Sequence, residues 1–373
     1  MRFSKHLAVA AVAALGYGMT APGIALAGAG PSWVIQSTPS PGGRQGSILL
    51  GVSCPSARAC TAVGAFAPLA GFLGTIVEHW NGKKWAVQPA PRVKDGALQA
   101  VSCWSATACI SVGYDRKGTL AERWNGRKWA VQPMPRVKNG MLMGVSCSSA
   151  KACTAVGSKG NDTLAERWDG RKWAVQSTLN PVTGTDFSEL AGVSCSSATS
   201  CTAVGDSDIS DDKSDTLAEH WNGAKWAIQA AKPPSGNESW LAGVSCLSAR
   251  DCTAVGAYGT TNRSLTLAER WNGAKWVVQS TPNPSRSLYN ELTGVSCPSA
   301  KACTAVGDNS REANLAERWN GTKWALQHAP NPPHAGASPL LGVSCSAATA
   351  CTAVGPYVKK KSGAELTLAE RYS

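Results

Sequence analysis

The sequence predicts an all-β fold, a seven-bladed β-propeller of four-stranded antiparallel blades. Three observations predict it. Seven cysteine pairs, each with five residues between its two cysteines, recur along the 373-residue chain. Four short apolar runs, separated by turn residues, fill each complete repeat. The last repeat ends after its third run, and a matching fourth run stands near the start of the chain, at residues 32–36.

The cysteine spacing gives the period of the repeat. The first cysteines of successive pairs lie 44 to 51 residues apart, a period typical of a propeller blade or a helical array. In the second repeat the apolar runs are 98–103, 108–113, 119–124 and 128–132, and Asn125-Gly126 marks a hairpin between the last two. Because these runs are short and lack helical periodicity, the repeat is interpreted as a blade.

The two ends of the chain predict how the ring closes. Residues 368–373 supply a third strand without a fourth, while 32–36 match the fourth-strand pattern Lys-Trp-Ala-Val-Gln. The N-terminal strand should therefore complete the last blade and leave no open sheet edge. We expect one propeller domain over 28–373. Its blades are expected near 47–91, 96–135, 140–178, 189–230, 239–281, 290–329, and 339–373 with 32–38.

Residues 1–27 have the features of a secretory signal peptide. Arg2 and Lys5 form the charged start, 7–19 the apolar stretch, and Ala25-Leu26-Ala27 a cleavage motif. Cleavage after Ala27 would give a secreted, extracellular protein, which we expect to be a monomer. No later stretch reaches the roughly 18 continuous apolar residues of a membrane span, so none is expected in the mature chain.

The cysteines predict disulfides. Paired cysteines in an exported protein form disulfides, whereas a zinc site needs four ligands converging at one point. The pairs lie far apart in sequence, and no histidine accompanies them, so no metal or other cofactor is expected. The predicted disulfides are Cys54-Cys60, Cys103-Cys109, Cys147-Cys153, Cys195-Cys201, Cys246-Cys252, Cys297-Cys303 and Cys345-Cys351.

In an antiparallel blade, successive connections between strands lie alternately on the two faces of the ring. The disulfide loop and the Trp-Asn-Gly turn, which recur almost unchanged, share one face and are interpreted as structural. The second-to-third and fourth-to-first connections form the other, which we name the variable-loop face because their sequences differ between repeats. The predicted ligand-binding residues on it are Phe66, Tyr114, Arg116, Trp240, Tyr258, Tyr289 and Tyr357. Other aromatic residues expected there are Phe72 and Phe187.

Basic residues accompany these aromatics in a chain with 36 Lys+Arg and 24 Asp+Glu. They are Arg92, Lys94, Arg116, Lys117, Arg136, Lys138, Arg263, Arg286 and Lys359-Lys360-Lys361. Aromatic rings with polar neighbours suit sugar rings, and positive charge suits acidic polymers such as anionic cell-wall glycans. The alternative is that the aromatics cap the blade ends and the cations only solvate the face. Nucleic acid is not an expected partner, since no binding motif occurs.

Two patterns of carboxylate residues could serve catalysis or metal binding. A Glu recurs in each third strand, and because the seven occupy equivalent positions in different blades, each is interpreted as a structural hydrogen-bond acceptor or ion-pair partner, not a catalytic group. The acidic stretch 206–215 has calcium-loop spacing, which makes Asp206, Asp208, Asp211 and Asp212 a weak calcium candidate against a solvated loop. No catalytic residues are assigned.

The repeat Leu-x-Gly-Val-Ser-Cys-x5-Cys-Thr-Ala-Val-Gly, followed by Leu-Ala-Glu-Arg-Trp-Asn-Gly-x-Lys-Trp-Ala-Val-Gln, resembles repeats of secreted bacterial seven-bladed β-propeller proteins of unassigned function. The resemblance covers residues 32–373. The Trp-Asn-Gly-x-x-Trp hairpin is also similar to that of Trp-rich seven-bladed propeller lectins, which would imply sugar sites between blades. The paired cysteines depart from the lectin pattern, and no sugar-contacting residue carries over.

The sequence therefore favours a secreted, non-catalytic binding scaffold that recognises a glycan or cell-envelope polymer through the variable-loop face. One alternative is an enzyme, a polysaccharide lyase or glycoside hydrolase acting at the channel mouth. The other is a protein–protein interaction scaffold with an extracellular partner. A propeller fold alone does not distinguish these functions.

Overall fold

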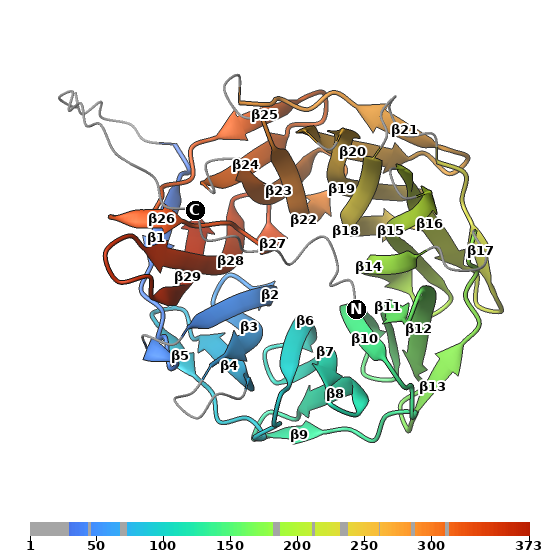
Figure 1. The fold of residues 1–373 in the computed structure, drawn as a ribbon, viewed down its shortest axis with the longest axis horizontal. Helices are drawn as coiled ribbons and strands as arrows, with labels where there is room; N and C mark the ends of the chain where they lie inside the picture. The colour runs from blue at the N-terminus through green and yellow to red at the C-terminus, as the bar shows by residue number, and fades with distance from the viewer. Residues whose placement is uncertain are drawn as a thin grey trace. The chain divides into compact units, whose positions relative to one another are not determined.

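The computed structural model describes residues 30–43, 46–67, 73–181, 187–210, 213–231, 238–260, 262–284, 288–309 and 313–373. The predicted signal peptide lies outside these residues. Pro31–Ser373 form one compact unit, built of seven antiparallel blades arranged in a ring (Figure 1). The described residues include no helix long and apolar enough to span a membrane.

Blades 1 to 6 each contain four sequential strands, numbered from the centre to the rim. Blade 1 holds β2 (Ser47–Ser56), β3 (Ala59–Phe66), β4 (Gly74–Trp80) and β5 (Trp85–Val87). Blade 2 holds β6 (Ala97–Ser105), β7 (Ala108–Asp115), β8 (Gly118–Trp124) and β9 (Trp129–Val131). Blade 3 holds β10 (Gly140–Ser149), β11 (Ala152–Lys159), β12 (Asp162–Trp168) and β13 (Trp173–Gln176). Blade 4 holds β14 (Ser188–Ser197), β15 (Ser200–Ser210), β16 (Lys213–Trp221) and β17 (Trp226–Ile228).

The remaining blades follow the same order. Blade 5 holds β18 (Glu238–Ser248), β19 (Asp251–Thr260), β20 (Arg263–Trp271) and β21 (Trp276–Gln279). Blade 6 holds β22 (Asn290–Ser299), β23 (Ala302–Asn309), β24 (Asn314–Trp319) and β25 (Trp324–Gln327). Blade 7 holds β26 (Ala335–Ala337), β27 (Gly342–Ala347), β28 (Ala350–Lys359), β29 (Glu365–Tyr372) and β1 (Trp33–Gln36). The first strands line the centre and the fourth strands lie at the rim (Figure 1).

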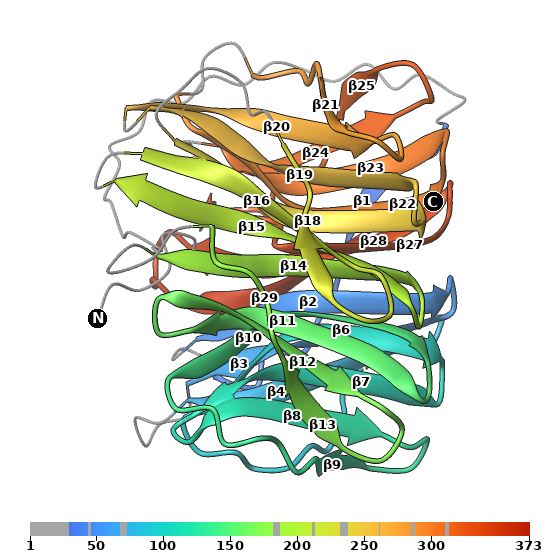
Figure 2. The same ribbon diagram turned by 90° about the vertical axis from the view of Figure 1, so that its right-hand side faces the viewer.

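Blade 7 closes the ring as the sequence predicts. The N-terminal strand β1 pairs antiparallel with β29, with Trp33 opposite Tyr372 and Gln36 opposite Ala369. The innermost position of this blade is shared by β26 and β27, which both pair with β28. Seen from the side, the blades stack around the ring with their strands running across its thickness (Figure 2). The all-β, seven-bladed fold and the closing strand are confirmed.

All seven predicted disulfides are present, with the bridged Cα atoms about 4.0 Å apart. Each joins the first two strands of its own blade. On the same face, the third-to-fourth turn is shaped by its Asn, as where Asn81 Oδ1 accepts hydrogen bonds from the backbone N–H groups of Lys83 and Lys84. Gly82 follows with φ 90°, a conformation that favours glycine. This geometry explains why the Trp-Asn-Gly turn recurs.

The hydrophobic core lies between blades. One cluster combines Leu49 and Trp80 of blade 1 with Val354 and Ala369 of blade 7, and equivalent clusters fill other junctions. In each blade the last aromatic residue of the third strand meets the fourth-strand Trp, with ring centroids 5.6–5.9 Å apart. The fourth-strand Trp residues are all buried. Large aromatic side chains therefore fill the space where the blades diverge toward the rim.

A ring of seven hydrogen bonds joins the blades near the centre. The backbone N–H of the first cysteine in each blade donates to the Ser Oγ that precedes the equivalent cysteine of the previous blade, over 2.9–3.0 Å. The last of these runs from Cys54 to Ser344 and closes the ring. Neighbouring first strands approach so closely that a Cβ at Gly243 would lie 3.1 Å from Gly294 Cα. The Gly-Val-Ser-Cys motif is thus the innermost blade-to-blade contact.

Further out, other repeated side chains make the same kind of contact. The indole N–H of a fourth-strand Trp donates to the Gln at the end of the previous blade in five of the seven junctions, as from Trp129 to Gln88 over 2.9 Å. The guanidinium of Arg371 lies 4.9 Å from the Trp80 ring of the next blade and donates to the backbone carbonyl of Ala57 there. Most repeated polar residues therefore hold one blade to the next.

We expect Ser102→Ala to lower the free energy of unfolding by about 1 to 3 kcal/mol, because it leaves the partly buried N–H of Cys147 without its acceptor. Denaturant unfolding measures this directly. Ser105→Ala, which removes only exposed turn hydrogen bonds to Thr107, is the matched control and should change stability by less than about 0.5 kcal/mol. Equal effects of the two substitutions would contradict the role assigned to the central ring.

Candidate functional site

The two faces of the ring are distinguished by their contacts. A Cβ at Gly82, in the third-to-fourth turn of blade 1, would lie 3.3 Å from Arg58 in the disulfide loop. The equivalent positions at Gly126 and Gly170 face Thr107 and Lys151 in the same way. The disulfide loops and Trp-Asn-Gly turns therefore pack together on one face. The other connections, and the residues predicted to bind a ligand, belong to the variable-loop face.

The aromatic residues of the variable-loop face are mostly half-buried. Phe66, Tyr258 and Tyr357 pack against the blade cores. Tyr114 is also half-buried, and burial raises the pKa of its hydroxyl. Tyr289 is 44% exposed and lies just before β22. Much of this aromatic surface thus supports the blade ends.

The strand register separates two of these aromatics. Trp240 pairs with Ala257, whereas Tyr258 pairs with Ser239, the residue before Trp240. Since neighbouring residues of a strand point to opposite sheet faces, Trp240 and Tyr258 lie on opposite sides of blade 5. Tyr258 packs toward the blade 4 junction, which leaves Trp240 on the blade 6 side, toward the segment that contains Tyr289. No single platform gathers the predicted aromatic residues, which are spread over blades 1, 2, 5 and 7 and the start of blade 6.

A repeated segment places cations on this face between blades 1 and 3. Pro-Arg-Val-Lys-Asp-Gly precedes blade 2, and Pro-Arg-Val-Lys-Asn-Gly precedes blade 3. The central Val93 and Val137 pack against blade cores, while the flanking Arg and Lys side chains are exposed. Asp95 and Asn139 turn the chain with φ 53° and 58°. Each segment is therefore held by its valine and presents two cations.

The second-to-third turns of blades 2 and 3 add further cations to those of the two repeated segments. The Arg116 guanidinium, 63% exposed, forms an ion pair with Asp95, which ties the second-to-third turn of blade 2 to the segment before it. The backbone N–H of Gly160 donates to the carbonyl of Asn139, so the blade 3 turn lies beside the second segment. We define the basic cluster as Arg92, Lys94, Arg116, Lys117, Arg136, Lys138 and Lys159, all exposed. The predicted residues Tyr114 and Arg116 belong to this sector.

Lys159 was not among the residues singled out from the sequence. It is the last residue of β11, at the position where other repeats have Phe66, Ser207 or Asn309. The contact between Gly160 and Asn139 and the pairing of Lys159 with Gly140 show that it joins the basic cluster. Of the other predicted cations, Arg263 and Lys359 to Lys361 are exposed on blades 5 and 7, and Arg286, like Phe72, lies outside the described residues.

The seven repeated Glu residues are fully buried at the blade junctions. They are Glu78, Glu122, Glu166, Glu219, Glu269, Glu317 and Glu370. Burial raises the pKa of Glu78, Glu317 and Glu370 to about 8 and that of the other four to about 7. Each carboxyl lies at the junction between its own blade and the previous one, at equivalent positions around the ring. This location fits the interpretation of these residues as structural hydrogen-bond acceptors.

Their hydrogen-bond partners come from the preceding blade. Asn314 Nδ2 donates to Glu370 over 2.6 Å, Thr75 Oγ1 to Glu122 over 3.4 Å, and the backbone N–H of Leu179 to Glu219 over 3.2 Å. Glu78, Glu166 and Glu317 lie near the hydroxyls of Thr367, Thr119 and Thr266, which lower their carboxyl pKa slightly but do not form well-aligned hydrogen bonds. Among the described residues, Glu269 has no such neighbour.

The acidic stretch of blade 4 is more regular than the expected loop. Asp206 and Asp208 lie in β15, opposite Thr216 and Ser214 of β16, and Asp206 is buried. Asp211 and Asp212, the other two predicted calcium ligands, lie outside the described residues. Within the described part of the chain, no three His, Cys, Asp or Glu side chains group as metal ligands.

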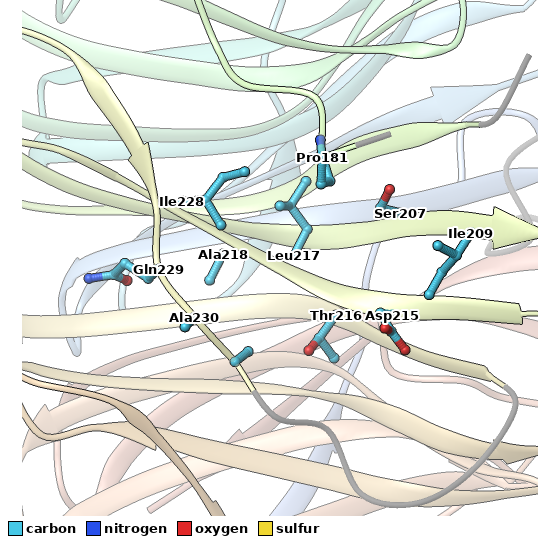
Figure 3. A pocket seen from close by; sticks show the side chains of 11 residues that line it. Pro181, Ser207, Ile209, Asp215, Thr216, Leu217, Ala218, Ile228, Gln229 and Ala230 are labelled. Atoms are coloured by element: carbon cyan, nitrogen blue, oxygen red, sulfur yellow. The ribbon is translucent and has the colours of Figure 1, made fainter. Parts of the chain in front are cut away.

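A groove of about 260 Å³ opens beside the third strand of blade 4. It runs along β16 where the chain leaves β17, as the close view of Ile228, Gln229 and Ala230 shows (Figure 3). Its lining residues are Pro181, Ser207, Ile209, Asp215, Thr216, Leu217, Ala218, Ile228, Gln229, Ala230 and Ala231. The groove is mainly apolar, with Asp215, Thr216 and Ser207 as polar groups.

No protein-family model and no curated protein sequence matches the chain. Among solved structures it is similar to YCF48 bound to D1 peptide, with 13% identity and TM-score 0.57 over 91% of this chain and 96% of that one. It is similar to U3-55K, with 10% identity and TM-score 0.62 over 92% and 100%. It is also similar to the six-bladed, fucose-recognising Aleuria aurantia lectin, with 12% identity and TM-score 0.52 over 78% and 97%. These similarities show the shared β-propeller fold.

The buried carboxyls predict a dependence of stability on pH. Because the folded-state pKa of Glu269 is about 7, against 4.5 in the unfolded chain, its contribution is fully present below pH 4.5 and is lost as pH rises toward 7. Glu269→Gln should therefore gain stability relative to the unchanged chain, by about 1 to 3 kcal/mol between pH 5 and pH 8. Denaturant unfolding across this pH range measures the difference. Parallel stability curves for the two proteins would contradict the assignment.

Proposed function

We propose that this protein is a secreted, non-catalytic binding scaffold that recognises an anionic glycan or cell-envelope polymer through its variable-loop face. The basic cluster is the observation that carries the proposal. Its seven cations come from three adjacent blades, and their side chains are exposed. A row of separate cations suits a ligand with repeated negative charges better than a small molecule with one.

The arrangement of the basic cluster supports an extended ligand. Val93 and Val137 anchor the two repeated segments, so the flanking cations project from fixed backbone. The described acidic residues within this sector are fewer: Asp95 pairs with Arg116, Asp115 caps its turn by accepting from the backbone N–H of Lys117, and Asp162 lies opposite Lys159 in the strand register. The sector therefore carries a net positive charge that an anionic polymer would meet along several blades.

Aromatic residues supply a second element of recognition. Tyr114 lies one residue before Asp115 at the edge of the basic cluster, and Trp240 and Tyr289 lie between blades 5 and 6. Their partly exposed rings can stack on the C–H faces of sugars. The fungal lectin among the similar structures recognises fucose, and YCF48 is bound to D1 peptide. These proteins support the use of a propeller as a binding scaffold for either class of ligand.

The compartment fits the proposal. Seven disulfides are typical of proteins that fold in an oxidising environment such as the extracellular space or the periplasm. The predicted signal peptide at 1–27 would deliver the chain there. A polymer of the cell envelope would be within reach in either place.

Replacing Arg92 and Arg136 together by alanine should weaken binding to polygalacturonate, an anionic glycan, at least about fivefold, because two exposed charges are removed. Binding of the unchanged protein should weaken between about 50 and 200 mM NaCl, since salt screens these contacts. Biolayer interferometry with dextran as the uncharged polymer measures both effects.

The matched control is Arg127→Ala with Lys128→Ala, which removes the same charge from the opposite face. This variant should bind polygalacturonate normally. Equal losses in the two double variants, or binding that ignores salt, would overturn the proposed site. Shortening of the polymer during the assay would instead favour the alternative of a lyase or hydrolase.

A further inference from the structure

The face opposite the variable loops carries its own array of exposed cations. We name it the repeat face and define it as the disulfide loops together with the turns between the third and fourth strands, at 80–85, 124–129, 168–173, 221–226, 271–276 and 319–324. Every residue of these loops and turns is described. The exposed cations of the repeat face are Arg58, Lys83, Lys84, Arg127, Lys128, Lys151, Arg171, Lys172, Lys225, Arg250, Lys275, Lys301 and Lys323.

The turns place a lysine at the same position in blades 1 to 6. In blade 2, Asn125 Oδ1 accepts hydrogen bonds from the backbone N–H groups of Arg127 and Lys128, each over 3.0 Å. Asp169 makes the same two contacts in blade 3, at 2.8 and 2.9 Å, and the other four turns repeat them. Equivalent positions in a ring lie at the same height along its axis (Figure 1), so the turn lysines form a planar array.

A second cation lies beside the turn in four of these blades. A Cβ at Gly170, in the turn of blade 3, would lie 3.1 Å from the Cβ of Lys151 in the disulfide loop. A Cβ at Gly273 would lie equally close to the Cβ of Arg250 in blade 5, and the loop cations of blades 1 and 6 take the same place. Like charges that start from neighbouring positions repel each other, and an anionic partner would relieve this repulsion.

Carboxylates are few on the repeat face. Its two acidic residues are Asp169 and Asp251. Asp169 accepts from the backbone of its own turn, and Asp251 forms an ion pair with Arg270 over 2.9 Å. Blades 1 to 6 therefore present a strongly positive plane.

Apolar side chains stand among these cations. The residue after the first cysteine of the disulfide loop is Pro55, Trp104, Leu247 or Pro298 in four blades. Leu247 is 40% exposed, and Trp104 is partly exposed. A linear polyanion would neutralise the cations but offer these side chains no apolar contact. The interface of an anionic bilayer offers both, because charged headgroups there lie above an apolar layer that leucine and tryptophan enter.

We propose that the repeat face docks on the surface of an anionic lipid bilayer. The cations of the turns and loops would contact headgroup phosphates, while Leu247 and Trp104 would reach the interfacial layer. The axis of the ring would then stand perpendicular to the membrane, and the variable-loop face would point away from it. This inference goes beyond the proposed function, since it concerns a different partner and the opposite face.

The test is co-sedimentation with lipid vesicles. It uses residues 28–373, because the apolar stretch at 7–19 would itself bind lipid and Pro31–Ser373 form the compact unit. At about 0.1 M NaCl, where charges act over about 10 Å, the protein should bind vesicles made of equal parts phosphatidylcholine and phosphatidylglycerol. It should not bind vesicles of phosphatidylcholine alone. Binding to neither kind of vesicle, or equal binding to both, would refute the proposal.

Removal of cations from the repeat face should weaken this binding. Replacing Lys83, Lys84, Arg171 and Lys172 together by glutamine should weaken vesicle binding at least about tenfold, since each cation near an anionic membrane strengthens binding about fivefold. This variant should still bind polygalacturonate. All four side chains are exposed, and the turns are held by backbone N–H groups, so the unfolding temperature should stay unchanged.

The matched control replaces Arg92, Lys94, Arg136 and Lys138 by glutamine, which removes the same charge from the variable-loop face. It should bind anionic vesicles normally and lose polygalacturonate, so the two proposals can fail separately. Equal loss of vesicle binding in the two variants would contradict docking through the repeat face.

The apolar contact separates a bilayer from other polyanions. Leu247→Ser should weaken binding to anionic vesicles at least about threefold, because it removes an apolar side chain from the interface, and should leave retention on a sulfonate cation exchanger unchanged. Vesicle binding equal to that of the unchanged protein would mean that charge alone acts on this face, and the assignment of a bilayer would be wrong.

Discussion

The structure depends on hydrogen bonds that run from each blade to the next near the centre of the ring. A backbone N–H at each first cysteine donates to the serine hydroxyl of the previous blade, and the bond between Cys54 and Ser344 makes the series continuous. In such a closed ring every blade packs between two neighbouring blades, so none of them is left as an exposed end. The β1 strand serves the same purpose at the rim, where it supplies the fourth strand that blade 7 lacks. The disulfide beside each serine fixes the hairpin whose N–H group is used.

The repeat unit can be understood as a set of blade-to-blade contacts at increasing distance from the centre. Nearest the centre, the serine hydroxyl accepts a hydrogen bond from the next blade, and further out the buried glutamate accepts hydrogen bonds from the previous blade. The arginine guanidinium stacks on the tryptophan ring of the next blade, and at the rim the fourth-strand tryptophan donates to the glutamine of the previous blade. Residues engaged in this way are not available for ligands. Specific recognition therefore falls to positions where repeats differ, and the basic cluster is one such position. This cluster arises from two copies of a charged connecting segment, 91–96 and 135–140.

The sequence was sufficient to predict the ring because period, strand pattern and end-matching are local signals repeated seven times. It also identified the disulfides and the two faces. The site was harder to predict, because an aromatic residue such as Phe66 or Tyr258 has the same sequence signal whether it binds a ligand or covers a blade core. The opposite orientations of Trp240 and Tyr258 follow from strand register, which depends on a bulge between Leu241 and Gly243. The place of Lys159 in the basic cluster depends on contacts between separate segments, such as that between Gly160 and Asn139, which the sequence alone does not show.

The central claim is that the repeated residues hold the ring together while the departures on the variable-loop face bind ligand. Hydrogen–deuterium exchange of the full chain, with and without polygalacturonate, tests it most directly. The account predicts added protection in the connecting segments around Arg92 and Arg136 and in the turns at Arg116 and Lys159, with no change in the Trp-Asn-Gly turns of the opposite face. Protection centred on those turns, or spread evenly over all seven blades, would contradict it.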